Sequence, residues 1–142
     1  MVQKALKPLN ISIDPASPLP VYEQVKQGIK ILIFAGHLQE GDQLVPIREL
    51  ANQLKINPNT IVKVYYQLDQ EGLIYPQHGS GYFVRPGFRP TFKNKRDLLL
   101  KITEEYLYKG LQLGFAVDEL TAAVRQSWTT AKPSVGREGV KR

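Results

Sequence analysis

Polar side chains that can hydrogen-bond to nucleic-acid bases gather on one face of a helix predicted at about residues 58–71. Asn59, Lys63 and Tyr66 fall at positions i, i+4 and i+7, so they share a helical face. The opposite face is apolar and carries Ile61, Val64 and Leu68. An Asn amide can pair with adenine, and a Lys ammonium can reach guanine acceptors or a phosphate. The predicted helix therefore carries the chemistry of base recognition.

The start of this helix is marked by Asn57 and Pro58, because Asn is favoured as an N-cap and Pro at the first helical position. The polar residues that open the helix and can face a DNA groove are Asn57, Asn59, Thr60 and Lys63. A plainer interpretation stays open, in which Asn57 only caps the helix and the other side chains form a solvated face.

Two predicted helices precede the polar one. Apolar residues repeat at helical spacing over about residues 20–35, where they are Tyr22, Val25, Ile29 and Leu32. Gly36 follows as a stop signal. A shorter helix is predicted at about 46–54, and only Lys55 and Ile56 separate it from Asn57. Two short helices joined by a tight turn predict a helix-turn-helix.

A β-hairpin is predicted directly after these helices. Two short apolar runs, Leu73–Pro76 and Tyr82–Arg85, flank a turn rich in glycine. A hairpin in this position is typical of the wing of a winged helix-turn-helix domain. Gln43 and Leu44 are predicted as a further short strand. We therefore expect an N-terminal arm at 1–19, a winged helix-turn-helix domain at 20–87 and a basic linker at 88–95.

The remaining residues predict two helices, at about 96–112 and 117–130. Such a pair has too few apolar residues to bury both faces alone, so we expect it to form a homodimer. The predicted interface residues are Leu99, Ile102, Tyr106, Leu120, Val124 and Trp128. The polar, basic tail at 131–142 is predicted to be disordered. The expected fold class is mostly α with a small β-hairpin wing, followed by a two-helix dimerisation domain.

The composition excludes several classes of function. The 142 residues include no Cys and two His, which rules out disulfides, thiolate metal sites and thiol catalysis. No metal or other cofactor is expected. No apolar run approaches the ~20 residues of a membrane span, so we expect no membrane partner and a cytoplasmic location. The net charge of +6 is compatible with nucleic acid but lies mostly beyond residue 90.

Three other functions are weighed against sequence-specific DNA binding. An enzyme is disfavoured because Gly79–Gly81 lacks the full nucleophile elbow and no phosphate-binding loop occurs. A non-specific architectural binder stays open, since the basic linker and tail could hold any duplex. A small-molecule effector also stays open. Aromatic residues that could line its pocket at a dimer interface, or form the interface core, are Tyr106, Tyr108, Phe115 and Trp128.

The stretch from Gly41 to Val84, GDQLVPIRELANQLKINPNTIVKVYYQLDQEGLIYPQHGSGYFV, resembles the winged helix-turn-helix signature of the GntR family of bacterial transcription regulators. The block INPNTIVKVYYQLDQEGLI, followed by a short two-helix part, is similar to the YtrA subfamily. That resemblance implies a homodimeric repressor that binds a double-stranded DNA operator, often of an ABC transporter operon.

The resemblance also implies DNA contacts for individual residues. Arg48 matches the Arg of the family's RELA block, and Asn57, Asn59, Thr60 and Lys63 match its recognition helix. The wing tip matches His78, Gly79 and Ser80. Other roles stay open for some of them: Arg48 could pair with Glu49 or Glu71, and His78 could be an ordinary exposed residue. Gly79 and Gly81 could serve only the hairpin turn.

Two departures from the family pattern concern DNA contacts. The family usually has Leu-Pro-Ser before its RELA block, whereas this chain has Leu44-Val45-Pro46 and lacks the capping hydroxyl. Many members carry Arg at the positions of Pro58 and Val62. With fewer charged contacts, we expect either weaker binding or a readout shifted towards amides, so the operator does not follow from those of other members.

Overall fold

The computed structural model describes residues 9–131. The predicted tail from 132 onward and the first eight residues of the predicted arm lie outside the described residues. The chain forms two compact units, Met1–Leu100 and Lys101–Arg142, which are treated separately below. No helix within residues 9–131 has both the length and the apolar character required to cross a membrane.

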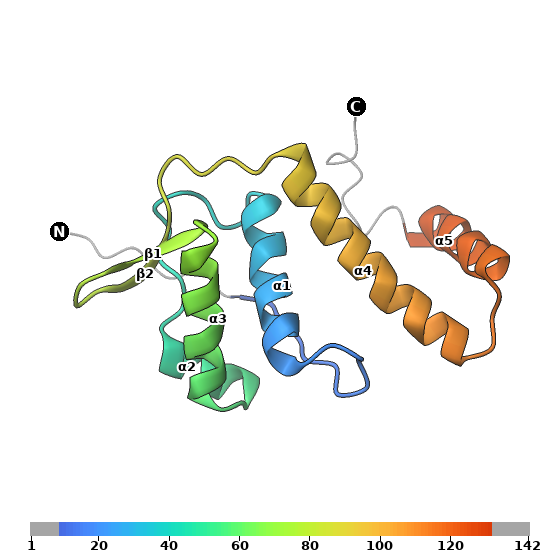
Figure 1. Ribbon diagram of the computed structural model, residues 1–142, viewed down its shortest axis with the longest axis horizontal. Helices are drawn as coiled ribbons and strands as arrows, with labels where there is room; N and C mark the ends of the chain where they lie inside the picture. The colour runs from blue at the N-terminus through green and yellow to red at the C-terminus, as the bar shows by residue number, and fades with distance from the viewer. Residues whose placement is uncertain (1–8, 132–142) are drawn as a thin grey trace. The chain divides into compact units, whose positions relative to one another are not determined.

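Three helices, a hairpin and the first residues of a fourth helix build the first unit (Figure 1). The first, α1, spans Val21–Phe34 and begins directly after Pro20, as predicted within a residue. It ends where Gly36 adopts φ +86°, a conformation that only glycine adopts without strain. Its buried residues are Val25, Ile29 and Ile33. The predicted apolar stripe ends on Leu32, which is only half-buried. The last buried residue of α1 is instead its neighbour Ile33.

The helix-turn-helix is formed by α2, Ile47–Leu54, and α3, Pro58–Gln70. Pro46 precedes α2 without any side-chain cap, so the lost hydroxyl is not replaced. Lys55 turns the chain in the left-handed region, at φ 60°. Asn57 then caps α3, its side chain accepting a hydrogen bond from the Asn59 N–H at 2.8 Å. The predicted tight turn is confirmed.

The core lies where the apolar faces of the three helices meet. On α3 the buried side chains are Ile61, Val64, Tyr65 and Leu68. The Tyr65 hydroxyl donates a hydrogen bond to the Val45 carbonyl, which ties α3 to the segment before α2. Burial, followed by the negative charge of Glu49, raises the pKa of Tyr65 above its ordinary value of 10.0. The phenol therefore stays protonated and keeps donating.

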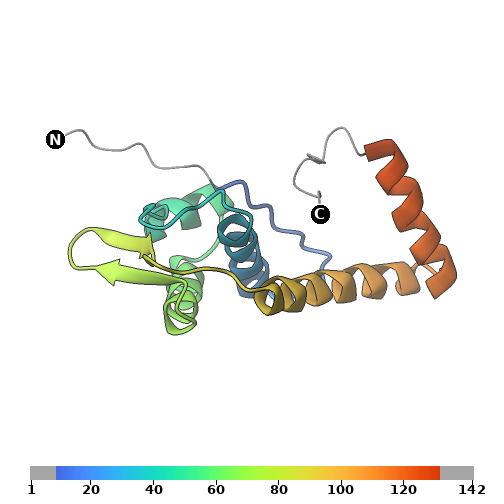
Figure 2. The same ribbon diagram turned by 90° about the horizontal axis from the view of Figure 1, so that it is seen from above.

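The wing is an antiparallel pair, β1 at Ile74–Gln77 and β2 at Gly81–Val84. Ile74 pairs with Val84, and the hairpin extends beyond the three helices (Figure 2). The predicted strand at Gln43 and Leu44 is reduced to a single bridge between Gln43 and Phe83. The wing is nevertheless joined to this segment, since the Leu44 N–H donates to the Tyr82 carbonyl at 2.9 Å.

The predicted linker at 88–95 is partly wrong, because α4 spans Phe92–Gln112 and begins four residues before the predicted start. Thr91 and Asn94 cap this helix reciprocally. The Thr91 hydroxyl accepts from the Asn94 N–H at 3.0 Å, and the Asn94 carbonyl oxygen accepts from the Thr91 N–H at 2.8 Å. These two bonds satisfy backbone donors that a helix start leaves open.

The residues before α4 are fastened to the first unit. Phe88 stacks on Phe34 with ring centroids 6.0 Å apart. The Glu40 carboxylate accepts from the Gly87 N–H at 2.6 Å and pairs with Arg89. These two partners, the Gly87 N–H first, hold the pKa of Glu40 below its ordinary value. This stretch is therefore packed against the end of α1 and the loop that follows it.

The second unit contains the C-terminal part of α4 and α5, Val117–Ala131, close to the predicted helix. The two helices meet where Leu120 packs over Gly110, a position at which a Cβ would collide with the Leu120 side chain. The Tyr106 hydroxyl donates to the Leu120 carbonyl at 2.7 Å. A glycine at 110 thus permits the close crossing of the two helices.

Lys55 offers a test of the turn between α2 and α3. A side chain in the left-handed region costs about 1 kcal/mol relative to glycine. We expect Lys55→Gly to raise the free energy of unfolding by about this amount in urea titrations followed by circular dichroism. Lys55→Ala is the matched control, because it removes the ammonium but keeps the Cβ. Equal stability of the two variants would contradict the assigned backbone strain.

Candidate nucleic-acid interface

The exposed face of α3 carries the predicted base-reading residues. Asn59, Lys63 and Tyr66 are all exposed, and Tyr66 is 58% accessible. Thr60 is half-buried and lies toward the edge of this face. Val62 also belongs to the exposed surface, at 47% accessible, and was not among the predicted site residues. The sequence could have predicted the exposure of Val62, because Val62 lies next to Lys63 and outside the helical spacing of the buried residues.

Asn57 acts as the predicted N-cap. Its side-chain oxygen is occupied by the Asn59 N–H at 2.8 Å. The capping interpretation is therefore confirmed for Asn57, and its contact with DNA stays a prediction.

The Lys63 side chain does not extend alone from α3. Its Nζ atom lies 3.7 Å from the centroid of the Tyr22 ring on α1, within the range of a cation–π contact. Local periodicity places Lys63 on the polar face but does not reveal this contact, because Tyr22 belongs to another helix.

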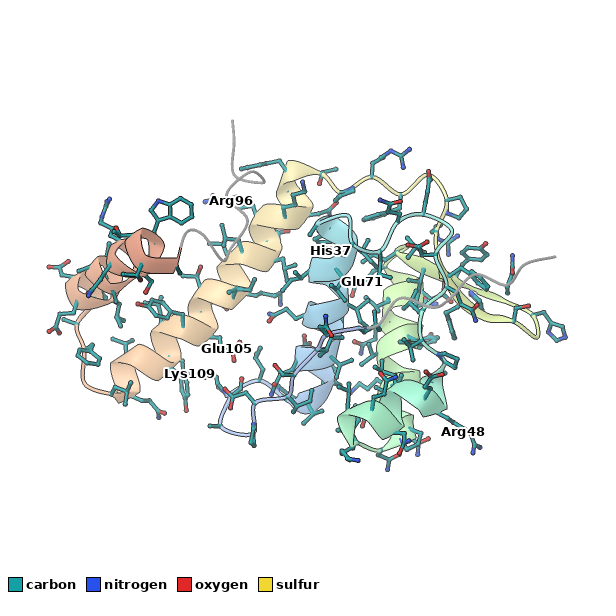
Figure 3. The ribbon with its side chains drawn as sticks, turned by 180° about the vertical axis from the view of Figure 1, so that it is seen from behind. His37, Arg48, Glu71, Arg96, Glu105 and Lys109 are labelled. Atoms are coloured by element: carbon teal, nitrogen blue, oxygen red, sulfur yellow. The ribbon has the colours of Figure 1, made fainter. Side chains whose placement is uncertain are left out.

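The far end of α3 is held by ion pairs with α1. Glu71 lies 2.5 Å from Lys26 and 2.7 Å from Lys30, between the two helices (Figure 3). Partial burial alone would raise the pKa of Glu71, but hydrogen bonds and charges from both lysines outweigh it and lower the pKa below 4.5. The carboxylate is therefore ionised at neutral pH.

Arg48 extends outward from the first turn of α2 (Figure 3). The alternative pairings with carboxylates are wrong for the described residues, since Glu71 pairs with lysines and the Glu49 carboxylate accepts from Gln53 at 3.4 Å. No ion pair within residues 9–131 engages Arg48, which leaves its guanidinium available to an anion.

The wing tip places His78, Gly79 and Ser80 on the surface. Gly79 has φ +76° and Gly81 has φ +115°, so both serve the turn, as the structural interpretation predicted. The Gln43 amide donates to the Ser80 carbonyl at 2.7 Å and braces the tip. Sequence reasoning missed this role of Gln43, which has no local signal.

The base of the wing is fixed by Arg85. Its guanidinium contacts the Asp69 carboxylate at 3.3 Å and the Ile74 carbonyl at 3.2 Å, and it lies 5.7 Å from the Tyr75 ring. The wing is thereby attached to the last turn of α3.

The predicted interface residues of α4 and α5 divide into two groups. Those exposed on a single chain are Leu99, Ile102, Tyr106, Val124 and Trp128. Leu120 differs, because it is only 5% accessible and packs on Gly110 within the same chain. The contact of Leu120 with a second copy stays a prediction, as do the contacts of the other five residues. No group of three His, Asp or Glu side chains within the described residues could hold a metal ion.

The helix-turn-helix, the wing and the exposed polar face of α3 define a DNA-binding domain of the winged helix-turn-helix class. The family model "Bacterial regulatory proteins, gntR family" matches residues 21–84, and the chain belongs to the GntR family. It is therefore a DNA-binding transcription regulator and not an enzyme.

The relatives agree with the expected subfamily. The chain is 37% identical to the HTH-type transcriptional repressor YtrA of Bacillus subtilis, over 72% of this chain and 83% of the relative. YtrA from Sulfolobus acidocaldarius, a GntR-family transcription factor, has a TM-score of 0.53 at 35% identity, covering 66% and 95% of the two chains. A GntR family transcriptional regulator from Listeria monocytogenes reaches 0.58 at 29% identity, covering 80% and 98%.

The ion pairs of Glu71 predict a pH effect on stability. Because the pKa of Glu71 lies below 4.5 in the folded chain, the folded state binds this proton less readily than the unfolded chain. The stabilisation is complete above about pH 5 and is lost as the pH falls through the folded pKa. We expect Glu71→Gln to lower the melting temperature at pH 7 and to flatten its decline in acid.

The measurement is thermal unfolding by circular dichroism between about pH 7 and pH 3. Glu104→Gln, which neutralises an exposed carboxylate of α4, serves as control and should follow the parent chain. A Glu71→Gln curve parallel to that of the parent chain at every pH would argue against the ion pairs.

Proposed function

We propose that this chain acts as a homodimeric repressor that recognises a two-fold symmetric operator. The observation that carries the proposal is the exposed α3 surface formed by Asn59, Val62, Lys63 and Tyr66. In a helix-turn-helix the second helix enters the major groove and its first residues meet base edges. An amide, a methyl-bearing side chain and an ammonium together can recognise adenine, the thymine methyl group and guanine.

Arg48 and the wing add contacts outside the major groove. Arg48 lies in the first turn of α2, where backbone N–H groups and the helix dipole favour a phosphate. His78, Gly79 and Ser80 lie at the exposed tip of the wing, which suits the minor groove. Phosphate contacts orient the domain, whereas the α3 side chains provide sequence preference.

The second unit supplies the proposed dimer contact. Its exposed apolar side chains include Ile102, Tyr106 and Val124, while Leu120 is the buried residue of α5. The two helices contact each other where Leu120 packs on Gly110, and most of their other apolar side chains stay exposed. A second copy would bury this apolar surface. Dimers of this kind bind half-sites about one helical turn apart.

The proposed role is repression, because the Bacillus relative is named a repressor. A transporter operon as the target rests on the subfamily resemblance. The operator itself must be found by selecting random DNA duplexes with the purified protein and locating the consensus in the source genome.

Asn59→Ala tests base reading by α3. We expect the ratio of operator affinity to random-duplex affinity to fall about 5- to 150-fold, the equivalent of a lost bidentate base contact. Fluorescence anisotropy at fixed salt gives both affinities. Asn52→Ala removes the same amide from the exposed face of α2 and should leave the ratio unchanged. An unchanged ratio in Asn59→Ala would remove this residue from the reading face.

Val124→Arg tests the dimer. Val124 is 54% accessible, and an arginine there would place a charge in the proposed apolar contact. We expect a folded monomer at low micromolar concentration in analytical ultracentrifugation, with weakened operator binding. Gln126→Arg is the control, because it adds the same side chain two residues away, on another face of α5. A dimeric Val124→Arg protein with parental stability would place the interface elsewhere.

A further inference from the structure

Three side chains of α1 meet three side chains of α3 at matching four-residue intervals. Those of α1 are Tyr22, Lys26 and Lys30, and those of α3 and its C-cap are Lys63, Gln67 and Glu71. The Lys26 ammonium bridges two of the positions, lying 3.3 Å from the Gln67 amide oxygen and 2.5 Å from Glu71. This series, the α1–α3 ladder, follows one edge of the helix pair from Lys63 to the end of α3.

We propose that Tyr22 is a positioning residue for sequence recognition, acting through Lys63. This inference rests on the proposed function of Lys63 in base reading. Tyr22 is half-buried and packs against the core, so its ring is a fixed surface on α1. The Lys63 ammonium lies 3.7 Å from the centroid of that ring.

The contact restricts the lysine without neutralising it. A lysine side chain has a long flexible stem and loses much rotational freedom when its ammonium is fixed. The ring of Tyr22 fixes the ammonium in the free protein, before DNA arrives. The ammonium has three N–H donors and the ring faces it from one side, so donors remain for a base.

Restriction matters because an unrestrained lysine acts as a mobile point charge that suits any phosphate. An ammonium held at one position favours the duplex that places a guanine acceptor there. The rest of the α1–α3 ladder keeps Tyr22 in register with Lys63, because Glu71 pairs with Lys26 and Lys30 further along the same edge. Tyr22 thus contributes to specificity without touching DNA.

The test compares Tyr22→Leu, Tyr22→Phe, Lys63→Ala and the Tyr22→Leu, Lys63→Ala double variant. Each is measured for its affinity to the selected operator and to a random duplex over a range of salt concentrations. The readout is the ratio of the two affinities, which does not depend on the fraction of active protein.

We expect Tyr22→Leu to reduce this ratio about 2- to 30-fold, the equivalent of a lost cation–π contact. Tyr22→Phe keeps the ring and should restore the ratio to within about twofold. In the Lys63→Ala background, Tyr22→Leu should have no further effect. The salt dependence of Tyr22→Leu should match that of the parent chain, because the ammonium is still present.

A second readout is the ring-current shift of the Lys63 methylene protons in the free protein, which Tyr22→Leu should abolish and Tyr22→Phe should retain. The proposal is overturned if Lys63→Ala loses specificity while Tyr22→Leu keeps it, or if the two losses are additive. A higher ratio in Tyr22→Leu would also overturn it, since the ring would then hold the ammonium away from DNA.

A different set of results would show that Lys63 does not read bases. If Lys63→Ala leaves the ratio unchanged, both this inference and the reading role of Lys63 are wrong. Operator selection by the parent chain and the loss in Asn59→Ala would still stand on their own. If the parent chain selects no sequence at all, the proposed function is wrong, whatever the result for Tyr22.

Discussion

Helix α3 must bury one face and present the other, and the rest of the first unit follows from this constraint. Burial of Ile61, Val64, Tyr65 and Leu68 sets the rotation of the helix about its axis. Rotation away from this setting would expose apolar surface at about 25 cal/mol per Å². The polar face is therefore oriented by the core, while the Asn57 cap and the ion pairs of Glu71 hold the two ends.

Charge pairing within the first unit explains why the net charge of +6 is a poor guide to the DNA-binding surface. Several basic side chains serve the fold: Lys26 and Lys30 pair with Glu71, Arg85 with Asp69, and Arg89 with Glu40. These pairs attach α1 and the wing to the end of α3, and the segment before α4 to the loop after α1. Among the residues predicted to contact DNA, Arg48 and Lys63 are the cations.

Local signals account for the elements that were predicted well. The limits of α1 and the start of α3 follow from Pro20, Gly36 and the Asn57–Pro58 pair, which act on the backbone of their immediate neighbours. The apolar stripe predicts a start of α4 that is four residues too late, because the stripe begins after the helix does. Thr91 and Asn94 contained the missing signal, a reciprocal cap three residues apart. Periodicity does not reveal that Leu120 packs on Gly110 of the same chain, because the two residues lie on different helices.

The sequence alone determined the class of fold and the polar face of α3, because helical period, capping residues and turn glycines act over a few neighbouring positions. Only the tertiary structure decided which side chains meet across that fold. Lys26 and Gln67 are 41 positions apart, and Lys63 meets Tyr22 from the same two helices. Such contacts depend on how the buried faces pack, so the placement of the Lys63 ammonium is a property of the core and not of its local sequence.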